Sequence, residues 1–397
     1  MDYDILISGG GIAGLTAAAA FGSAGFSVLC VDPAPPVTER EAAGADLRTT
    51  AFLQPARDFL DQCGLWARLE SHAMPLQVMR IIDAGGERPE PRVTRDFDAE
   101  DISERPFGWN LPNWLLRREI SAHLHEMPGV EFRPGTGTST LFTREAGARV
   151  GLSDGTHANV RLVIAADGRS SPMRRAAGIG VRTTRFGQKA LAFAVTHPIP
   201  HGNVSTEIHR TGGPFTLVPL PDLDGQPSSA VVWMEEGPKA EALFKLDTPA
   251  LEAAMSERSC HILGPLTLAS QRTLWPIIAQ HAERLAGERL ALVAEAAHVV
   301  PPIGAQGLNM SLNDLRALHA LALKAPERLG DRQMLERYHR QRILDIRARV
   351  AGITLLNRTS MLSAPPLRDA RAKALDAFYG IAPVRRTLMQ LGLGTRT

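Results

Sequence analysis

Three glycines near the start of the chain have the spacing of a phosphate-binding turn. Gly9, Gly11 and Gly14 form the pattern G-x-G-x-x-G. The first glycine makes the turn, the second lets a pyrophosphate approach the backbone, and the third allows a helix to pack closely on a strand. Amides at the start of that helix can hold the phosphates. Asp32 lies 18 residues beyond Gly14, where a carboxylate can accept hydrogen bonds from a ribose.

The segments around these glycines predict the strand, turn, helix and strand that such a site needs. An apolar run over residues 3–7 precedes the turn, an alanine-rich stretch follows it, and a second apolar run, 26–31, ends on Asp32. Because this whole context is present, a dinucleotide site is favoured over a glycine turn that only connects a buried βαβ unit.

Two other predicted strand ends carry residues that could contact the same ligand. The apolar run 160–166 is typical of a strand buried on both faces, and it ends at Asp167-Gly168. A second strand, 289–293, leads into a glycine-containing turn and a helix that reaches about Leu323. Ligands of α/β proteins bind at the carboxyl ends of such strands. The helix N-terminus is also suited to stabilise negative charge on a bound ring.

Two arginines are further candidates for contacts with a phosphate or a ribose. Arg48 lies in a turn after the ribose-binding strand, where a cofactor contact and an ordinary surface cation are both open. Arg117 lies near the start of a helix predicted from residue 114 to Met127, which Pro128-Gly129 ends.

Length and composition restrict the class of protein. The chain has 397 residues, 44% of them hydrophobic, which allows about two or three domain-sized units. A net charge of +2 argues against a nucleic-acid partner. Three cysteines without a C-x-x-C pair predict buried thiols in a reducing compartment and no metal site. We expect a cytoplasmic protein, since the first strand leaves no room for a signal peptide and no run of about 18 apolar residues occurs.

The middle of the chain predicts an antiparallel sheet. Short apolar segments alternate with turn clusters between residues 186 and 275, with one helical excursion that begins at Thr248-Pro249. Between residues 181 and 280 there are 8 lysines and arginines and 9 acids, and the predicted strands carry almost no charge. This region therefore favours an apolar substrate over an anionic one.

From Asp331 onward the chain is predicted to be helical and basic. One helical face carries Ile343, Ile346, Val350 and Ile353. A helical layer packed on the core is favoured, and a basic amphipathic surface resting on a membrane is the alternative.

Three motifs occur in an order that resembles one known family. They are Gly9 to Gly14, Ala166-Asp167-Gly168, and Glu295 to Asn309. Together they resemble the single-component FAD-dependent aromatic hydroxylases with the p-hydroxybenzoate hydroxylase fold. The likeness extends over essentially the whole chain and points in particular to the ubiquinone-biosynthesis branch, whose members hydroxylate the ring of a polyprenylated phenol. Further matches to that branch are Phe186-Gly187-Gln188, Val231-Val232-Trp233 and Pro302 to Asp314.

The resemblance implies an α/β fold with a Rossmann-like FAD-binding domain, an interleaved antiparallel-sheet substrate domain and C-terminal helices. The FAD-binding domain would be discontinuous, with residues 1–75, 110–180 and 281–330. The substrate domain would comprise 76–109 and 181–280, and the C-terminal helical region 331–397.

Positions that match the family's motifs are implied to bind FAD. The ADP half would contact the glycine turn and Asp32, and the two arginines would contact ribityl and phosphate groups. Asp167 matches a carboxylate at the diphosphate side, with Arg174 at the family's spacing behind it, and Glu295 stands where the family has an aspartate bound to a ribityl hydroxyl. The implied cofactor-binding residues are Gly9, Gly11, Ile12, Ala13, Gly14, Asp32, Arg48, Arg117, Asp167, Gly168, Glu295, Pro302, Gly304, Ala305, Gln306, Gly307 and Asn309.

Two departures from the family pattern fall in the third motif. The usual Gly-Asp pair is Ala294-Glu295, and the usual Ala-Gly-Gln-Gly is Gly304-Ala305-Gln306-Gly307. Glutamate keeps the hydrogen-bond acceptor and adds a methylene, which predicts a shifted ribityl chain.

The function implied is hydroxylation of a prenylated phenol through a flavin C4a-hydroperoxide, with NAD(P)H as donor and O₂ as co-substrate. Gln188, Phe215 and Trp233 are the predicted substrate-pocket residues. No catalytic residue is assigned, since His209 and His298 are candidate bases by residue type only. A peripheral site on the inner face of the membrane, a lipid-presenting partner and a homo-oligomer stay open. The alternatives are a hydroxylase of a small soluble aromatic compound and a non-catalytic binding protein with a flavin fold.

Overall fold

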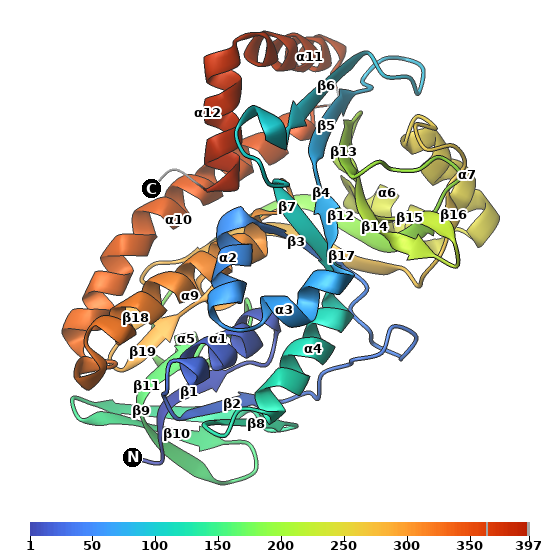
Figure 1. Cartoon of the computed structure of the whole chain (residues 1–397). Coiled ribbons are helices and arrows are strands. Elements are labelled where there is room, and N and C mark those ends of the chain that lie inside the picture. Colours follow the sequence, from blue (N-terminus) through green and yellow to red (C-terminus); the bar gives the residue numbers. More distant parts are fainter. Residues whose placement is uncertain (363, 395–397) are drawn as a thin grey trace.

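The first sheet is built around a parallel core that contains the glycine turn. The computed structural model describes residues 1–362 and 364–394 (Figure 1). Five neighbouring strands run parallel in the order β19-β11-β1-β2-β8, and β18, β10 and β9 add antiparallel strands. The strands of this sheet are β1 (Tyr3–Ser8), β2 (Val28–Asp32), β8 (Val130–Pro134), β9 (Thr138–Arg144), β10 (Gly147–Leu152), β11 (His157–Ala165), β18 (Ala286–Gly287) and β19 (Leu290–Leu292).

A helix of small residues covers this sheet closely. Helix α1 (Ile12–Ser23) has its residues 12–21 buried, and it packs against α4 (Asn113–His125) and α9 (Gln306–Lys324). Four consecutive alanines, 17–20, let the helix axis approach its neighbours on several sides. The βαβ unit predicted from the sequence is thereby confirmed, and its two strands pair directly with each other.

The second sheet is large and mainly antiparallel. Its strand order is β20-β17-β12-β15-β14-β13-β5-β6, with β16 paired to β12. One pair departs from the antiparallel prediction, because β5 and β13 run parallel. The strands are β5 (Val78–Asp83), β6 (Val93–Asp98), β12 (Val181–Thr196), β13 (Val204–His209), β14 (Pro214–Leu223), β15 (Gln226–Glu236), β16 (Thr267–Leu268), β17 (Thr273–Ala282) and β20 (His298–Val299).

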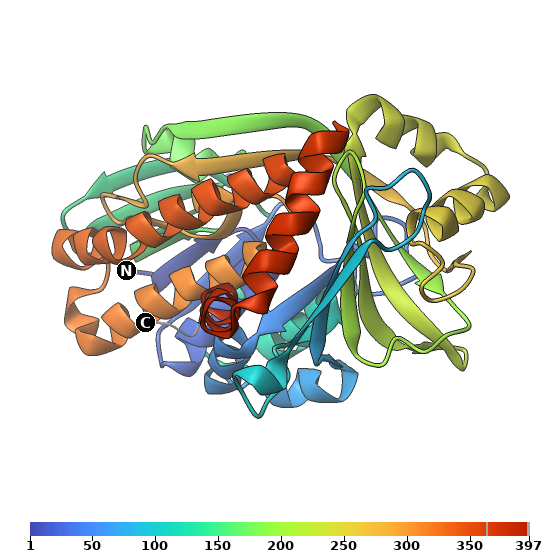
Figure 2. The same cartoon turned by 90° about the horizontal axis from the view of Figure 1, so that it is seen from above.

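Two helices cover one face of the second sheet. Helices α6 (Gly237–Lys245) and α7 (Thr248–Arg258) lie on the side of the sheet away from the first sheet (Figures 1 and 2). The sequence predicted only one helix here, with Thr248 as its cap. The structure has two, and Asp247 caps the second by accepting a hydrogen bond from the backbone N–H of Ala250. Helix α6 was missed because it follows β15 directly, without an intervening loop.

A small third sheet connects the two larger ones. Strand β7 (Gly108–Pro112) pairs with both β3 (Thr49–Leu53) and β4 (Met74–Leu76). Between β3 and β4 the chain forms α2 (Gln54–Gln62) and α3 (Trp66–Leu69). The buried amide of Asn110 donates to the carbonyl of Pro219, so this sheet contacts β14 directly.

Three helices at the end of the chain pack against the sheets or against one another. They are α10 (Arg332–Ser360), α11 (Pro365–Gly380) and α12 (Ala382–Leu393). The isoleucine and valine face predicted for α10 is buried, and the Tyr338 hydroxyl donates 2.7 Å to the carbonyl of Leu292. This favours the packed helical layer of the two alternatives. Among the described residues, no helix combines the length and apolar character needed to cross a bilayer.

Candidate functional site

The three motifs that the sequence separates meet at one edge of the first sheet. Ser8 pairs with Ala165, and Ala165 pairs with Leu292, so the carboxyl ends of β1, β11 and β19 are neighbours. Their contact is close: a Cβ on Gly9 would lie 2.4 Å from the carbonyl oxygen of Ala166. The chain segments after these strands therefore line a common edge, where α/β proteins bind ligands.

The glycine turn is tight on one side and open on the other. A Cβ on Gly14 would lie 1.8 Å from the carbonyl oxygen of Gly9, whereas a Cβ on Gly11 would meet nothing within 4 Å. Asp32 holds the turn, because its carboxylate accepts from the backbone N–H groups of Gly10 at 2.6 Å and Ala34 at 2.8 Å. The open side, at Gly11, is where a pyrophosphate can approach the backbone.

Asp167 presents an unpaired carboxylate oxygen at the same edge. Its Oδ2 accepts from the backbone N–H of Met173 at 3.1 Å and from the Ser8 hydroxyl at 3.3 Å. Its Oδ1 is buried and has no partner in the described part of the chain. Burial raises the pKa of the Asp167 carboxyl above its usual range. A buried acceptor without a partner is costly, and a ligand hydroxyl or amide at this place would satisfy it.

Arg174 joins the second and third motifs. Its guanidinium is buried and donates from Nη1 to the carbonyl of Ala296 and from Nη2 to that of Arg169, both at 2.8 Å. Burial lowers the pKa of Arg174. The backbone between these two motifs is thus held by charge-assisted hydrogen bonds. Arg174 therefore has a positioning role here rather than a direct ligand contact.

Arg48 and Arg117 are brought together by a carboxylate that the sequence reasoning missed. Asp46 accepts from Arg48 Nε at 2.8 Å and Nη2 at 2.7 Å, and Arg117 Nη2 lies 3.8 Å from it. The Nε of Arg117 is buried without a partner. Arg48 also lies over the ring of Trp275, 5.6 Å from its centroid. The spacing Asp46-x-Arg48 could have indicated this fork-to-fork pair.

Glu295 is exposed although both of its neighbours are buried. Its charge helps to raise the pKa of Arg48, after the larger effect of the hydrogen bond from Arg48 to Asp46. Glu295 and Arg48 therefore face the same space from two different segments. This placement fits the ribityl and phosphate contacts that the resemblance implies for them.

Both departures from the family pattern put alanine at a left-handed backbone position. Ala294 has φ 53° and Ala305 has φ 55°, and each stands where the family pattern has glycine. Glycine adopts positive φ freely, but alanine pays roughly 1 kcal/mol or more for it because its Cβ approaches the following carbonyl oxygen. The third motif therefore has a left-handed backbone at two positions that lack glycine, the residue that favours this conformation.

Asn309 and Gln306 anchor the turn at the start of α9. The Asn309 side chain accepts from the N–H of Leu53 and donates to the carbonyls of Ala51 and Ala305, at 2.6–2.9 Å. Gln306 donates to the carbonyls of Gly304 and Gly392. These two side chains are used in holding the turn to β3 and α12. The half-exposed Pro302 and Gly304 and the exposed Gly307 leave its outer surface available.

A chain of buried and half-buried ion pairs supports the same turn. Asp314 accepts from His298 Nε2 at 2.6 Å and Arg342 Nε at 2.8 Å. Asp345 then accepts from Arg342 Nη1 at 2.7 Å and from Arg349 Nε at 2.9 Å. The chain ends at the turn itself, where Arg349 Nη1 donates to the Gln306 Oε1 at 2.8 Å.

Both histidines that were candidate bases are paired with carboxylates. His298 is buried against Asp314, and His209 lies 2.8 Å from Glu207 at the end of β13. His298 therefore helps to support the turn at the start of α9. Neither histidine is assigned as a catalytic base. Within the part of the chain that the structure describes, no three His, Cys, Asp or Glu side chains are grouped to hold a metal ion.

The pocket prediction for Phe215 and Trp233 needs correction. These rings lie 5.3 Å apart in the core between the second sheet and helices α6 and α7. Strand alternation turns their neighbours Thr216 and Val232 to the opposite face, which packs on the core of the first sheet. Gln188 is buried, donates a hydrogen bond to the carbonyl of Gly212 and accepts one from the Asn357 amide. The alternating pattern was visible in the sequence, but which face meets the first sheet was not.

Comparison with known proteins identifies the family. The model of the FAD binding domain family matches residues 2–351. A ubiquinone hydroxylase, UbiL, of Rhodospirillum rubrum is 33% identical over 396 residues, covering 99% of this chain and 90% of the relative. This chain belongs to the FAD binding domain family. A 3-demethoxyubiquinol 3-hydroxylase of Escherichia coli is 26% identical, with 98% of each chain covered.

Solved structures confirm the fold of this family member. The p-nitrophenol 4-monooxygenase PnpA of Pseudomonas putida DLL-E4 superposes with a TM-score of 0.79 at 19% identity, covering 99% of this chain and 98% of that one. PqsL of Pseudomonas aeruginosa gives 0.77 at 22% identity, covering 94% and 99%. The predicted fold class is thereby confirmed. The resemblance to the family is confirmed by the family model and the sequence relatives.

A methyl group added on the tight side of the glycine turn should affect stability, and one added on the open side should affect FAD binding. We expect Gly14→Ala to lower the free energy of unfolding by about 1–3 kcal/mol, because its Cβ overlaps the Gly9 carbonyl. Gly11→Ala should leave stability nearly unchanged and weaken FAD binding. Chemical denaturation without FAD and flavin fluorescence titration measure the two quantities. A Gly11→Ala variant that binds FAD normally would contradict this geometry.

Asp167 predicts a pH-dependent stability in the FAD-free chain. Because its pKa is raised by folding, the native state favours the protonated carboxyl, and the carboxyl destabilises the fold as pH rises above the ordinary value of 3.8. The stability of Asp167→Asn relative to the unsubstituted chain should therefore increase over that rise. Asp2→Asn is the control with the opposite slope, which lies below pH 3.8 because the backbone N–H of Asn159 lowers the Asp2 pKa. A stability difference for Asp167→Asn that is independent of pH would contradict the raised pKa.

Replacing an alanine at a left-handed backbone position by glycine should stabilise the fold. Ala305→Gly should raise the free energy of unfolding by about 0.5–1 kcal/mol, because relief of the Cβ contact exceeds the added backbone entropy. Ala320→Gly, at an exposed position inside α9, should instead lower it by about 1 kcal/mol. Urea unfolding of the two variants provides the comparison. Equal losses in both would show that Ala305 carries no strain.

Proposed function

We propose that this chain is an FAD-dependent monooxygenase that hydroxylates the aromatic ring of a prenylated phenol in ubiquinone biosynthesis. The observation that carries the proposal is the convergence of three strand ends on one open edge. There Gly11 is unobstructed, Asp167 has an unpaired buried oxygen, and Glu295 faces outward. Family membership supports FAD as the cofactor, and the names of the relatives support the ubiquinone pathway.

The residues present fit the parts of FAD. The turn at Gly11 would receive the diphosphate and Asp32 would face the ribose of the ADP half. Glu295 would accept a hydrogen bond from a ribityl hydroxyl, and the Asp167 carboxylate would lie at the diphosphate side. Arg117, whose Nε has no partner, would neutralise phosphate charge. The turn from Pro302 to Gly307 would lie against the isoalloxazine, where the N-terminus of α9 favours negative charge on the ring.

The chain's own contribution to the reaction is placement and exclusion of water. When bound, the flavin would supply a reduced ring that activates O₂, with NAD(P)H as the proposed electron donor. The face of the second sheet that packs toward the first presents half-buried, uncharged side chains, among them Thr216, Val218 and Val232. Such a surface orients an apolar ring and keeps water from the reacting centre. It favours a prenylated phenol over an aromatic acid.

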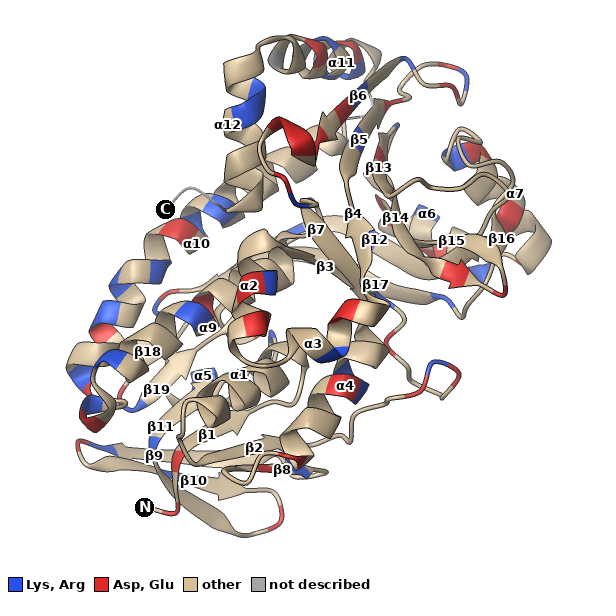
Figure 3. Ribbon diagram, viewed as in Figure 1, with Lys and Arg blue, Asp and Glu red and all other residues tan. Residues whose placement is uncertain are grey.

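We extend the proposal to contact with a membrane or a lipid-presenting partner at the C-terminal helices. Exposed leucines lie on α10, α11 and α12, and Figure 3 shows lysines and arginines along the same helices. A prenylated substrate is delivered from lipid, so an apolar surface with basic residues suits its transfer. The leucines are Leu355, Leu356, Leu367, Leu388 and Leu391.

Purified protein and an ¹⁸O₂ reaction test the proposed function directly. The whole chain, reconstituted with FAD, should show a flavin spectrum and consume NADH or NADPH faster when a short-chain prenylphenol is added. Mass spectrometry should find one ¹⁸O atom in the product. Gly11→Ala is the matched variant that should lose flavin and activity together. A protein that cannot be reconstituted would support the non-catalytic alternative, and turnover of soluble phenols alone would support the other hydroxylase class.

A further inference from the structure

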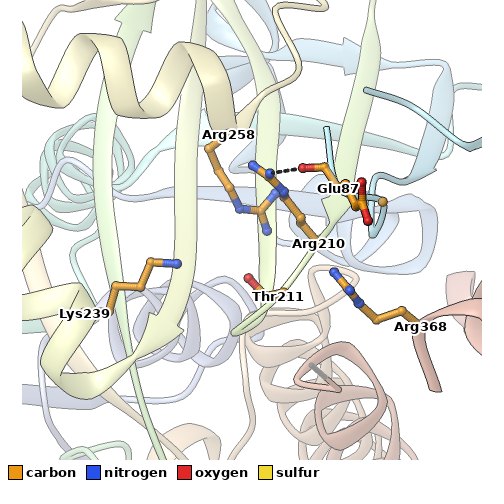
Figure 4. A pocket seen from close by; sticks show the side chains of 7 residues that line it. Glu87, Arg210, Thr211, Lys239, Arg258 and Arg368 are labelled. Atoms are coloured by element: carbon orange, nitrogen blue, oxygen red, sulfur yellow. Dashed lines mark hydrogen bonds between the residues drawn. The ribbon is translucent and has the colours of Figure 1, made fainter. Parts of the chain in front are cut away.

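A cavity lies away from the sheet edge that carries Gly11 and Asp167, at the place where the second sheet meets α7 and α11. Its volume is about 410 Å³. Figure 4 shows side chains from the β5–β6 turn, the β13–β14 turn, α6, α7 and α11 around one space. None of its lining residues belongs to the three motifs described above. They are Gly86, Glu87, Arg210, Thr211, Lys239, Arg258 and Arg368.

The lining of this cavity is strongly cationic. It contains three arginines and a lysine against one carboxylate, that of the exposed Glu87. Arg210 contacts Glu257 at 3.2 Å, and Lys239 contacts Glu235 at 2.8 Å. The Glu235 carboxylate also acts on the charge of Arg258, so these two acids offset part of the positive charge of the lining.

Arg258 is buried at the bottom of the cavity. Only 6% of the residue is exposed, and Nη2 donates to the carbonyls of Ile208 and Gly213 at 3.2 and 2.8 Å. Its Nε and Nη1 have no hydrogen-bond partner among the residues that the structure describes. Burial lowers its pKa to about 10. An unpaired buried guanidinium is costly, and an acceptor within the cavity would remove that cost.

Arg368 and Arg210 supply charge at the rim of the same cavity. The Nε of Arg368 is buried without a partner, and Arg210 Nη2 donates weakly, at 3.4 Å, to the carbonyl of Glu87. Figure 4 shows both side chains and Arg258 directed toward the common space. Arginine forks from separate elements, with a hydroxyl at Thr211, match the several acceptor oxygens of a tetrahedral dianion better than one carboxylate.

We propose that this cavity binds a phosphate group, either of a soluble phosphorylated compound or of a lipid headgroup. The buried Arg258 would donate through its Nε and Nη1, and Arg210 and Arg368 would close on the outer oxygens. The site is independent of the proposed oxygenase function, since no residue is shared between them. A ligand there would link the β13–β14 turn to α11.

The test uses the full chain saturated with FAD, so that phosphate cannot occupy the cofactor's diphosphate site. Calorimetric titration with inorganic phosphate and pyrophosphate, at constant ionic strength set with chloride, gives the affinity for free anions. Flotation with phosphatidylcholine vesicles, with and without phosphatidic acid, tests the headgroup. Each is repeated with Arg210→Gln/Arg368→Gln, with Arg258→Gln, and with Arg332→Gln, which removes an exposed arginine of α10.

The expected result is saturable binding of at least one phosphate probe. The rim double variant should weaken it by about tenfold or more, the loss of about 1.4 kcal/mol or more, while Arg332→Gln leaves it unchanged. Binding of free phosphate assigns a soluble ligand, and capture only by phosphatidic acid vesicles assigns a lipid. The rim double variant decides the matter if Arg258→Gln does not fold. No binding of any probe, or binding that the rim variant leaves intact, would overturn the proposal.

Discussion

Parallel pairing of β11 with both β1 and β19 is the constraint on which the candidate site depends. It brings residues 8, 165 and 292 into adjacent positions, although more than a hundred residues of chain separate each from the next. Gly11, Asp167 and Glu295 each follow one of these strands. Arg174 then ties the second motif to the third with buried charge-assisted bonds, so the loops at the edge cannot separate without losing them.

The second sheet is placed against this edge by a few specific contacts. Asn110 connects the third sheet to β14, and Arg48 lies over Trp275 of β17. The ion-pair chain from His298 to Gln306 fixes the turn at the start of α9 between them. A rigid support of this kind suits a site that must hold a flat cofactor in one orientation, because misplacement by an ångström is costly in catalysis.

The two sides of the second sheet serve different purposes. The side that packs on α6 and α7 is a closed apolar core with Phe215 and Trp233 at its centre. The other side is half-buried and uncharged near Val232, where it meets the first sheet. At its far margin, four cations gather around a cavity built from several elements. The sheet thus has an apolar face toward the first sheet and a basic cavity at its margin.

The sequence by itself determined the parts of this protein that depend on local spacing. The glycine pattern, the strand before it and the alanine-rich helix after it specify a βαβ unit, because turn geometry and helix packing act within about 30 residues. The Asp167 corner and the buried face of α10 were predictable for the same reason.

Only the tertiary structure decided which groups meet across the chain. The pairing of Asp46 with Arg48 and Arg117, the outward direction of Glu295, and the burial of Phe215 under α7 depend on how sheets pack. A period of two shows that a strand has two faces but does not say which one meets the other sheet. The cavity at Arg258 is lined by residues from turns and helices that are distant in the sequence, so no local sequence pattern predicts it.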